Sequence, residues 1–197
     1  MTNAMIKELV KVIPDECIEK EFETSSRTSI YRKVASLPVR ILLERGLISG
    51  SVLNFGKGKY DIDSDTIRAE SKHRNCSDYD YTFARNTDLL GCHFDTVVAA
   101  YVVNTLPPIS RSVVWSQIAS VTDRNGTAYI AARSIRDKHI KGEPYKDGVR
   151  TSVGTFQIGY ADEQLLGESR QHFKHTRILV SRAAFVIVEC RHTPFND

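Results

Sequence analysis

The chain has 197 residues, of which 41% are hydrophobic and 26% are charged, which is typical of a globular protein that folds as one domain. A formal net charge of +3 is too small by itself to indicate a polyanion-binding protein, and no apolar run approaches the roughly 20 residues of a membrane helix. The first residues lack the basic-then-apolar pattern of a signal peptide, so we expect a cytoplasmic protein with no membrane partner.

Cysteine and histidine spacing gives no indication of a metal site. The four cysteines are scattered, without a CxxC pair. His172 and His175 are three residues apart, but no second pair of ligands accompanies them. We therefore expect reduced thiols and no bound metal.

Residues 1–50 have the apolar spacing of helices. Met5, Leu9, Val12 and Ile13 recur at helical intervals within residues 3–22, and residues 25–28 break the pattern. A second helical period runs from residue 29 to residue 47, with Pro38 as a break near its middle. We expect a helical layer over residues 1–50, followed by a sheet-containing core over residues 51–197.

A glycine-containing loop follows the first predicted strand. The apolar run Val52–Phe55 breaks into Gly56 and Gly58 before a helix expected over residues 61–73. Glycines let a ligand approach the main chain, and a helix start offers free N–H groups. This pattern predicts a cofactor loop that includes Gly56, Gly58 and Asp61, although a plain turn between strand and helix has the same glycines.

Asp80 lies on a second β-type run, residues 76–81, about 20 residues after the glycines. In nucleotide-binding α/β folds, a carboxylate at this position accepts hydrogen bonds from the ribose hydroxyls. The alternative interpretation is a solvated carboxylate at a strand end.

The remaining elements alternate between strands and helices. Residues 95–104 form a continuous apolar run, as expected for a parallel strand buried on both faces. The following elements are a helix capped by Ser110, a strand over 127–132 after the Asn125-Gly126 turn, a long polar loop, a helical segment over 161–173, and strands over 177–180 and 184–190. This order predicts an α/β fold with a doubly wound, Rossmann-like sheet whose last pair of strands is antiparallel.

Three groups of residues carry a resemblance to a known family. The first group precedes the glycine loop and comprises Arg27–Arg32, Ser36–Arg40 and Glu44–Ile48. The second is Tyr101–Asn104, at the end of the long apolar run. The third lies later in the chain and comprises Asp147–Ser152 and Gly154–Gln157. Together they resemble class I S-adenosylmethionine-dependent methyltransferases, and in particular the methyltransferases associated with DNA phosphorothioation. The resemblance covers most of residues 26–170. It implies a methyltransferase-like domain over residues 1–197 with a Rossmann-like methyltransferase sheet, a closing hairpin and extra N-terminal helices.

The resemblance also implies a set of site residues. S-adenosylmethionine is expected to contact Asn54, Gly56, Gly58, Asp61, Asp80 and Tyr101, and Asn104 is expected at the reacting end as the catalytic residue. The substrate is expected to contact Arg27, Thr28, Arg32, Arg133, Lys138, Thr155, Phe156 and Gln157. For Asn104, the alternative is an asparagine that forms a turn before Pro107-Pro108.

The predicted function is methyl transfer from S-adenosylmethionine, with nucleic acid as the acceptor. Basic residues interleaved with Tyr145 over residues 133–150 suit phosphate contact and base stacking, but an ordinary solvated loop has the same composition. The chain departs from the family pattern at Asn54, where an acid is usual, and at Tyr60, where a third glycine is usual. The alternative function is therefore a catalytically degenerate methyltransferase-fold protein that acts by binding or regulation.

Overall fold

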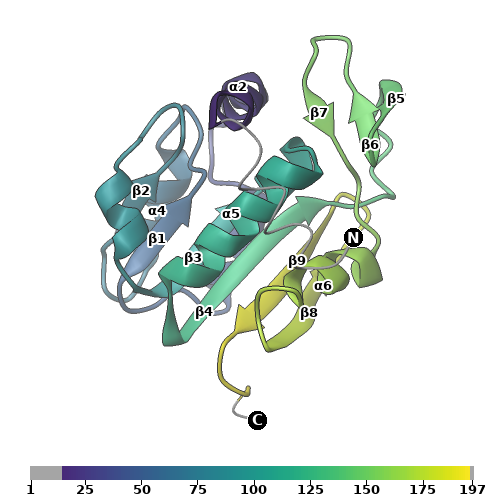
Figure 1. Cartoon of the computed structure of the whole chain (residues 1–197). Helices are drawn as coiled ribbons and strands as arrows, with labels where there is room; N and C mark the ends of the chain where they lie inside the picture. Colours follow the sequence, from purple (N-terminus) through teal and green to yellow (C-terminus); the bar gives the residue numbers. More distant parts are fainter. Residues whose placement is uncertain (1–14, 196–197) are drawn as a thin grey trace.

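The centre of the protein is a six-stranded sheet with strand order β2-β1-β3-β4-β9-β8. The computed structural model describes residues 15–195. Strands β1 (Val52–Phe55), β2 (Ser77–Tyr79), β3 (Phe94–Ala100) and β4 (Thr122–Arg133) run parallel to one another. Strands β8 (His175–Ser181) and β9 (Phe185–Arg191) form an antiparallel pair that joins the sheet through β4 (Figure 1). The predicted α/β fold with a closing antiparallel hairpin is confirmed.

Helices cover both faces of this sheet. Helices α5 (Pro108–Val121) and α6 (Asp162–Ser169) pack on one face, and Trp115 of α5 is the largest side chain in that core. Helix α2 (Asp15–Ser26) joins the same core through Phe22. Helices α3 (Leu37–Glu44) and α4 (Ile62–Glu70) cover the opposite face. The burial of both faces explains why residues 97–100 of β3 form a continuous apolar run.

The boundaries of the first predicted helices differ from the expectations. Residues 3–14 of the first prediction lie outside the described residues, and α2 continues to Ser26, past the expected end at residue 22 and into the expected break at residues 25–28. The prediction of a helix from 29 to 47 was wrong for its first part, because only α3 forms and Pro38 lies in its first turn. Proline suits the first turn of a helix, where its missing N–H costs nothing, so Pro38 begins this helix instead of interrupting one.

The predicted strand over 95–104 was too long. It ends at Ala100, because Tyr101 adopts a φ of 64° and leaves the extended conformation. Residues Val103–Thr105 then form a short 3-10 helix, η2. Asn104 therefore belongs to η2 and does not close the strand.

Two further boundaries differ from the predictions. Helix α5 begins at Pro108, and Ser110 lies inside it, donating its hydroxyl to Glu21 of α2 instead of capping the helix. Strand β4 begins at Thr122, and Asn125-Gly126 lies in an irregularity of its pairing with β3 instead of a turn. A side chain at Gly126 would meet the Phe94 carbonyl oxygen at 2.7 Å, which explains why glycine is needed there.

The polar loop predicted over residues 133–150 contains regular structure. Strands β5 (Glu143–Tyr145), β6 (Gly148–Arg150) and β7 (Phe156–Gln157) form a second, antiparallel sheet beyond the end of β4 (Figure 1). In the part of the chain that the structure describes, no helix has the length and apolarity to cross a membrane, and no cluster of His, Cys, Asp and Glu is arranged to hold a metal ion. The four cysteines are free thiols, and two of them, Cys17 and Cys92, are exposed.

Candidate active site

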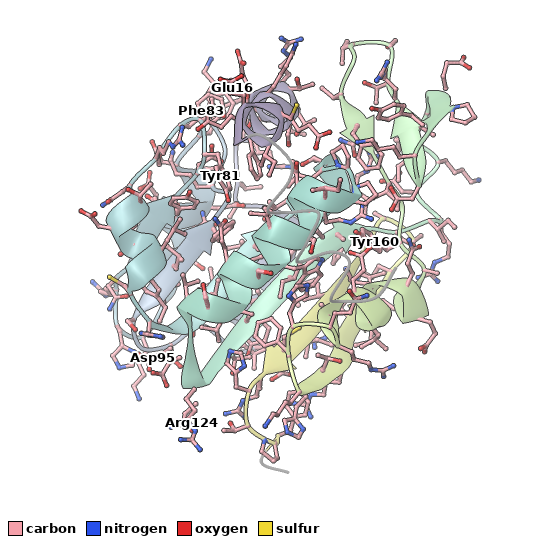
Figure 2. The ribbon with its side chains drawn as sticks, in the orientation of Figure 1. Glu16, Tyr81, Phe83, Asp95, Arg124 and Tyr160 are labelled. Atoms are coloured by element: carbon pink, nitrogen blue, oxygen red, sulfur yellow. The ribbon has the colours of Figure 1, made fainter. Side chains whose placement is uncertain are left out.

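A cavity of about 550 Å³ opens at the edge of the sheet where the parallel strands end. Its lining includes the loop after β1, the residues after β2 and β3, η2, and the segment that joins α2 to α3. In Figure 2, Tyr81 and Phe83 lie beside α2 at this end of the sheet, whereas Asp95 and Arg124 lie at the opposite end. Clefts at the carboxyl ends of parallel strands are the usual ligand sites of open α/β sheets, and this volume is typical of small-molecule sites.

The glycine loop turns sharply away from β1 into this cavity. Gly56 and Gly58 have φ values of 73° and 74°, a conformation that side chains disfavour. The Gly56 N–H donates to the Tyr79 carbonyl at 2.7 Å, which ties the loop to β2. A Cβ on Gly56 would lie 2.4 Å from Val102, and one on Gly58 would lie 2.6 Å from the Ser29 hydroxyl. Both glycines are therefore required by conformation and by space.

Asp80 connects the loop to the end of β2. Its Oδ2 accepts the Gly58 N–H at 2.9 Å, and its Oδ1 accepts the N–H groups of Thr82 and Phe83 at 2.9 and 3.0 Å. Each carboxylate oxygen has more than one acceptor position, so Oδ2 retains capacity for a further donor. Asp78, the middle residue of β2, instead faces α4 and pairs with Arg68, whereas Asp80 lies beyond the end of the strand.

Asn54 lines the cavity and is nearly buried. The side chain is only 3% exposed, and its Nδ2 donates to the Ser64 hydroxyl at 2.9 Å. That hydroxyl in turn donates to Asp78. Among residues 15–195, no group donates to the Asn54 Oδ1, and Asn54 lines the cavity. The carbonyl end of this amide is thus available to a ligand.

Tyr101 occupies a strained backbone conformation at the end of β3. A φ of 64° is uncommon for a bulky residue and typically persists where surrounding contacts enforce it, often at functional sites. Its N–H donates to the Ala131 carbonyl at 2.8 Å, and the Arg32 guanidinium lies 5.8 Å from its ring centre. Burial raises the pKa of Tyr101 to about 12, so the phenol is neutral at physiological pH.

A polar cluster closes the far side of the cavity. Gln157 Oε1 accepts from Asn104 Nδ2 at 3.3 Å and from Arg133 Nη1 at 3.4 Å, and Arg133 is paired with Asp137 at 2.8 Å. Because a guanidinium can only donate, the oxygen of Gln157 must face Arg133 and its Nε2 must face away. Asn104 Oδ1 accepts the Arg133 N–H at 3.4 Å, so both ends of the Asn104 amide are engaged.

No protein-family model matches the chain, and no curated protein sequence is significantly similar to it. Solved structures share its fold at low sequence identity. The complex of DhpI with SAH aligns with a TM-score of 0.55 and 16% identity over 80% of this chain and 84% of that one. Burkholderia thailandensis 1,6-didemethyltoxoflavin-N1-methyltransferase, solved with bound 1,6-didemethyltoxoflavin and S-adenosylhomocysteine, aligns with a TM-score of 0.59 and 12% identity over 80% of this chain and 77% of that one.

An S-adenosylmethionine-dependent methyltransferase from Clostridium acetobutylicum aligns with a TM-score of 0.56 and 10% identity over 85% of this chain and 94% of that one. The chain has a methyltransferase fold. At these identities the similarity establishes the architecture, and the chemistry of the site has to be argued from its own residues.

The methyltransferase fold gathers two thirds of the predicted site residues around the cavity. Those that line it are Thr28, Arg32, Asn54, Gly56, Gly58, Asp80, Tyr101, Asn104, Arg133 and Gln157. Among the others, Arg27 and Lys138 are exposed outside the lining, and Asp61 is exposed and pairs with Lys57. Phe156 is buried in the core, and Thr155 is buried with its hydroxyl bonded to Thr151.

Sequence reasoning missed several residues that line the cavity. Tyr81 stacks on Phe22 of α2 with ring centres 3.5 Å apart, and Ser29 accepts the Lys59 N–H at 3.1 Å. Asp63 lines the cavity and accepts the Ser36 N–H at 2.6 Å. Lys57 also lines the cavity, and it is the one of these residues whose position was indicated by the sequence, because it lies between Gly56 and Gly58. The others depend on contacts between segments that are far apart in the chain.

Proposed function

We propose that the protein is an S-adenosylmethionine-dependent methyltransferase. The observation that carries the proposal is the cavity itself, in which the glycine loop, an unused acceptor on Asn54 and the Asp80 carboxylate meet at the carboxyl edge of a methyltransferase-fold sheet. Each of these features suits a different part of an aminoacyl nucleoside.

The residues present fit this cofactor. We assign the Asn54 Oδ1 as the acceptor for the ammonium group and the Asp80 Oδ2 as the acceptor for a ribose hydroxyl, since both residues line the cavity. Because Gly56 and Gly58 have no side chains, the main chain can turn sharply beside the cavity without a clash with Val102 or Ser29. The space of about 550 Å³ suits a ligand of this size together with part of an acceptor.

The chemistry demands little acid–base catalysis from the protein. When bound, the cofactor supplies an electrophilic methyl group on a sulfonium, and the chain's task is to hold the acceptor in line at near-attack distance while water is excluded. Tyr101, at the strained end of β3, shapes the wall beside the glycine loop. Asn104 positions Gln157, whose Nε2 has no partner among residues 15–195 and is placed to donate to the acceptor.

For the acceptor we propose a nucleic acid. The support is the resemblance to methyltransferases associated with DNA phosphorothioation, and the basic side chains Arg32, Lys57 and Arg133 that line the cavity. Participation in a phosphorothioation system is likewise a proposal that rests on the sequence motifs.

The second candidate is a methyltransferase-fold protein that binds a ligand without turnover. Its support is Asn54 and Tyr60, where the family pattern has an acid and a glycine. The hydrogen-bond network from Asn54 through Ser64 to Asp78 favours the first candidate, because the neighbouring residues form specific hydrogen bonds with the Asn54 amide.

Transfer of a labelled methyl group distinguishes the two candidates. The protein is incubated with methyl-labelled S-adenosylmethionine and, separately, single-stranded DNA, duplex DNA, RNA and a protein extract. Label on a nucleic acid is the expected result. Absence of transfer to every acceptor, by protein that binds S-adenosylhomocysteine, would support the binding protein instead.

A further inference from the structure

The segment that joins α2 to α3 forms part of the cavity wall. We call residues 27–36 the strap. The Lys59 N–H donates to Ser29 at 3.1 Å, and the Ser36 N–H donates to Asp63 at 2.6 Å, so the strap is attached to the glycine loop and to the start of α4. Arg32 lies against the Tyr101 ring and lines the cavity. A molecule bound in the cavity therefore lies next to the strap.

Large apolar side chains of the strap are exposed. Ile30, Tyr31 and Val34 are 60%, 68% and 58% accessible. The Tyr31 ring contacts the Tyr60 ring at an angle of 73° with centres 5.4 Å apart, so the two rings are not stacked on each other. Contiguous exposed apolar groups beside a cavity typically mark a binding surface.

The same segment is strongly basic. Arg27 and Lys33 of the strap are exposed, as is Arg40 of α3, and none of them forms an ion pair with the residues that the structure describes. The sequence contains no acidic residue from position 27 to position 43. An exposed cation with no carboxylate partner remains free to neutralise a phosphate.

The basic loop over residues 133–150 differs in this respect. Arg133 is paired with Asp137, and Lys146 is paired with Glu21. Arg136 donates to Ser181 and to the Arg182 carbonyl, and Arg150 lies over the Tyr145 ring at 4.1 Å. Most of its cations are thus held within the fold, whereas those of the strap are not.

We propose that the strap is the surface that binds the strand of a single-stranded nucleic acid. Arg27 and Lys33 contact phosphates, and Tyr31 stacks on a base next to the one that enters the cavity. This inference rests on the proposed function and names the form of its acceptor. A base inside a duplex cannot reach a cavity of this kind without leaving the stack, and stacking on an exposed ring likewise needs an unpaired base.

The test is fluorescence anisotropy with a fluorescein-labelled, mixed-sequence single-stranded DNA of about 16 nucleotides, a length within the range of single-strand sites. Three variants are compared with the parent over a salt series: Arg27→Gln with Lys33→Gln, Tyr31→Ala, and the charge-matched control Lys72→Gln with Lys174→Gln, two exposed lysines at the end of the sheet opposite the cavity. Calorimetry with S-adenosylhomocysteine is run on each variant.

The strap double variant should make the dependence of log affinity on log salt shallower by about 1.4, because two phosphate contacts are lost. Tyr31→Ala should weaken binding at least about fivefold, as expected for one lost stacking contact. The lysine control should bind as the parent does, and the duplex form of the DNA should bind less tightly than the single strand.

The other outcomes distinguish failure of the strap proposal from failure of the proposed methyltransferase function. If the strap variants bind DNA as the parent does, or if the lysine control is weakened equally, the strap is not the contact surface. A parent that binds S-adenosylhomocysteine but no DNA overturns this inference and leaves methyl transfer to another acceptor. A parent that binds DNA through the strap but no S-adenosylhomocysteine overturns the proposed function alone.

Discussion

At the scale of single residues, Asn54 is bonded in a way that an aspartate cannot reproduce. The Ser64 hydroxyl accepts from Asn54 and donates to Asp78, so its single hydrogen is already used. An aspartate at position 54 would compete with Asp78 for that hydrogen in a buried setting. The departure from the family pattern is therefore coupled to the residues around it.

This coupling is measurable. Asn54→Asp alone should destabilise the fold by about 1–3 kcal/mol, because one buried oxygen loses its donor. Combining it with Asp78→Asn restores a donor and an acceptor on the two sides of Ser64, so the double variant should be more stable than the sum of the single changes predicts. Urea unfolding of the four proteins gives the coupling energy, and additivity within about 0.5 kcal/mol would refute the network.

Residue types and spacing indicated part of the site in advance. Gly56, Gly58 and Asp80 followed from the strand and loop pattern, since these residues lie close to β1 and β2 in sequence. The orientation of Asn104 could not be predicted, because it is set by Arg133 and Gln157, which are 29 and 53 residues away. Local patterns identify positions at strand ends, whereas hydrogen-bond partners depend on the folded chain.

At the scale of elements, the glycine loop allows a controlled comparison. Gly46 and Gly56 have similar positive φ values of 63° and 73°, but a Cβ on Gly46 would meet nothing within 4 Å, whereas one on Gly56 would lie 2.4 Å from Val102. Alanine at either position carries the conformational cost, and only at position 56 does it also clash.

Gly46→Ala should therefore destabilise the protein by about 1–2 kcal/mol, the cost of the left-handed conformation. Gly56→Ala should add about 1–3 kcal/mol for overpacking and should also weaken binding of S-adenosylhomocysteine. Urea denaturation and calorimetry check the two effects. Equal destabilisation by both changes would show that Val102 moves aside at no cost.

Strands and helices were predicted well where burial produces a run of apolar residues, and poorly where a single residue interrupts a helical spacing. Most residues of β3 and β9 are buried, and these strands contain the apolar runs Val97–Ala100 and Phe185–Val188. The strap has helical apolar spacing, yet Ile30 and Val34 are exposed, because Pro38 starts a new helix and the preceding residues attach to the glycine loop. Periodicity cannot distinguish an apolar face that packs from one that binds a partner.

At the scale of the whole molecule, an ionic network around the buried Arg111 joins the small sheet to the main fold. Arg111 of α5 is 4% exposed, donates to Asp147 between β5 and β6, and pairs with Glu168 of α6 at 3.1 Å. Trp115 and Tyr160 also donate to Glu168, at 3.0 and 2.9 Å, and burial raises the pKa of Tyr160 well above its ordinary value. We propose on this basis that the chain unfolds as one domain.

Arg111→Met should destabilise the protein by about 1–3 kcal/mol, because Glu168, whose side chain is 19% exposed, would lose its cation. Arg85→Met is the matched control, since Arg85 pairs with Glu19 at a site where both side chains are 53% exposed, and it should cost less than about 1 kcal/mol. Urea unfolding followed by both circular dichroism and tryptophan fluorescence checks the magnitudes. Separate transitions for the two probes in the parent would contradict the single-domain proposal.

The most direct test of the central claim is a calorimetric titration of the folded parent protein with S-adenosylhomocysteine, with the Asp80→Ala variant alongside. The account predicts saturable binding at one site in the parent and a clear loss of affinity in Asp80→Ala, because that carboxylate both holds Gly58 and faces the cavity. Absence of binding to the folded parent at millimolar ligand would contradict the claim that this cavity is a cofactor site.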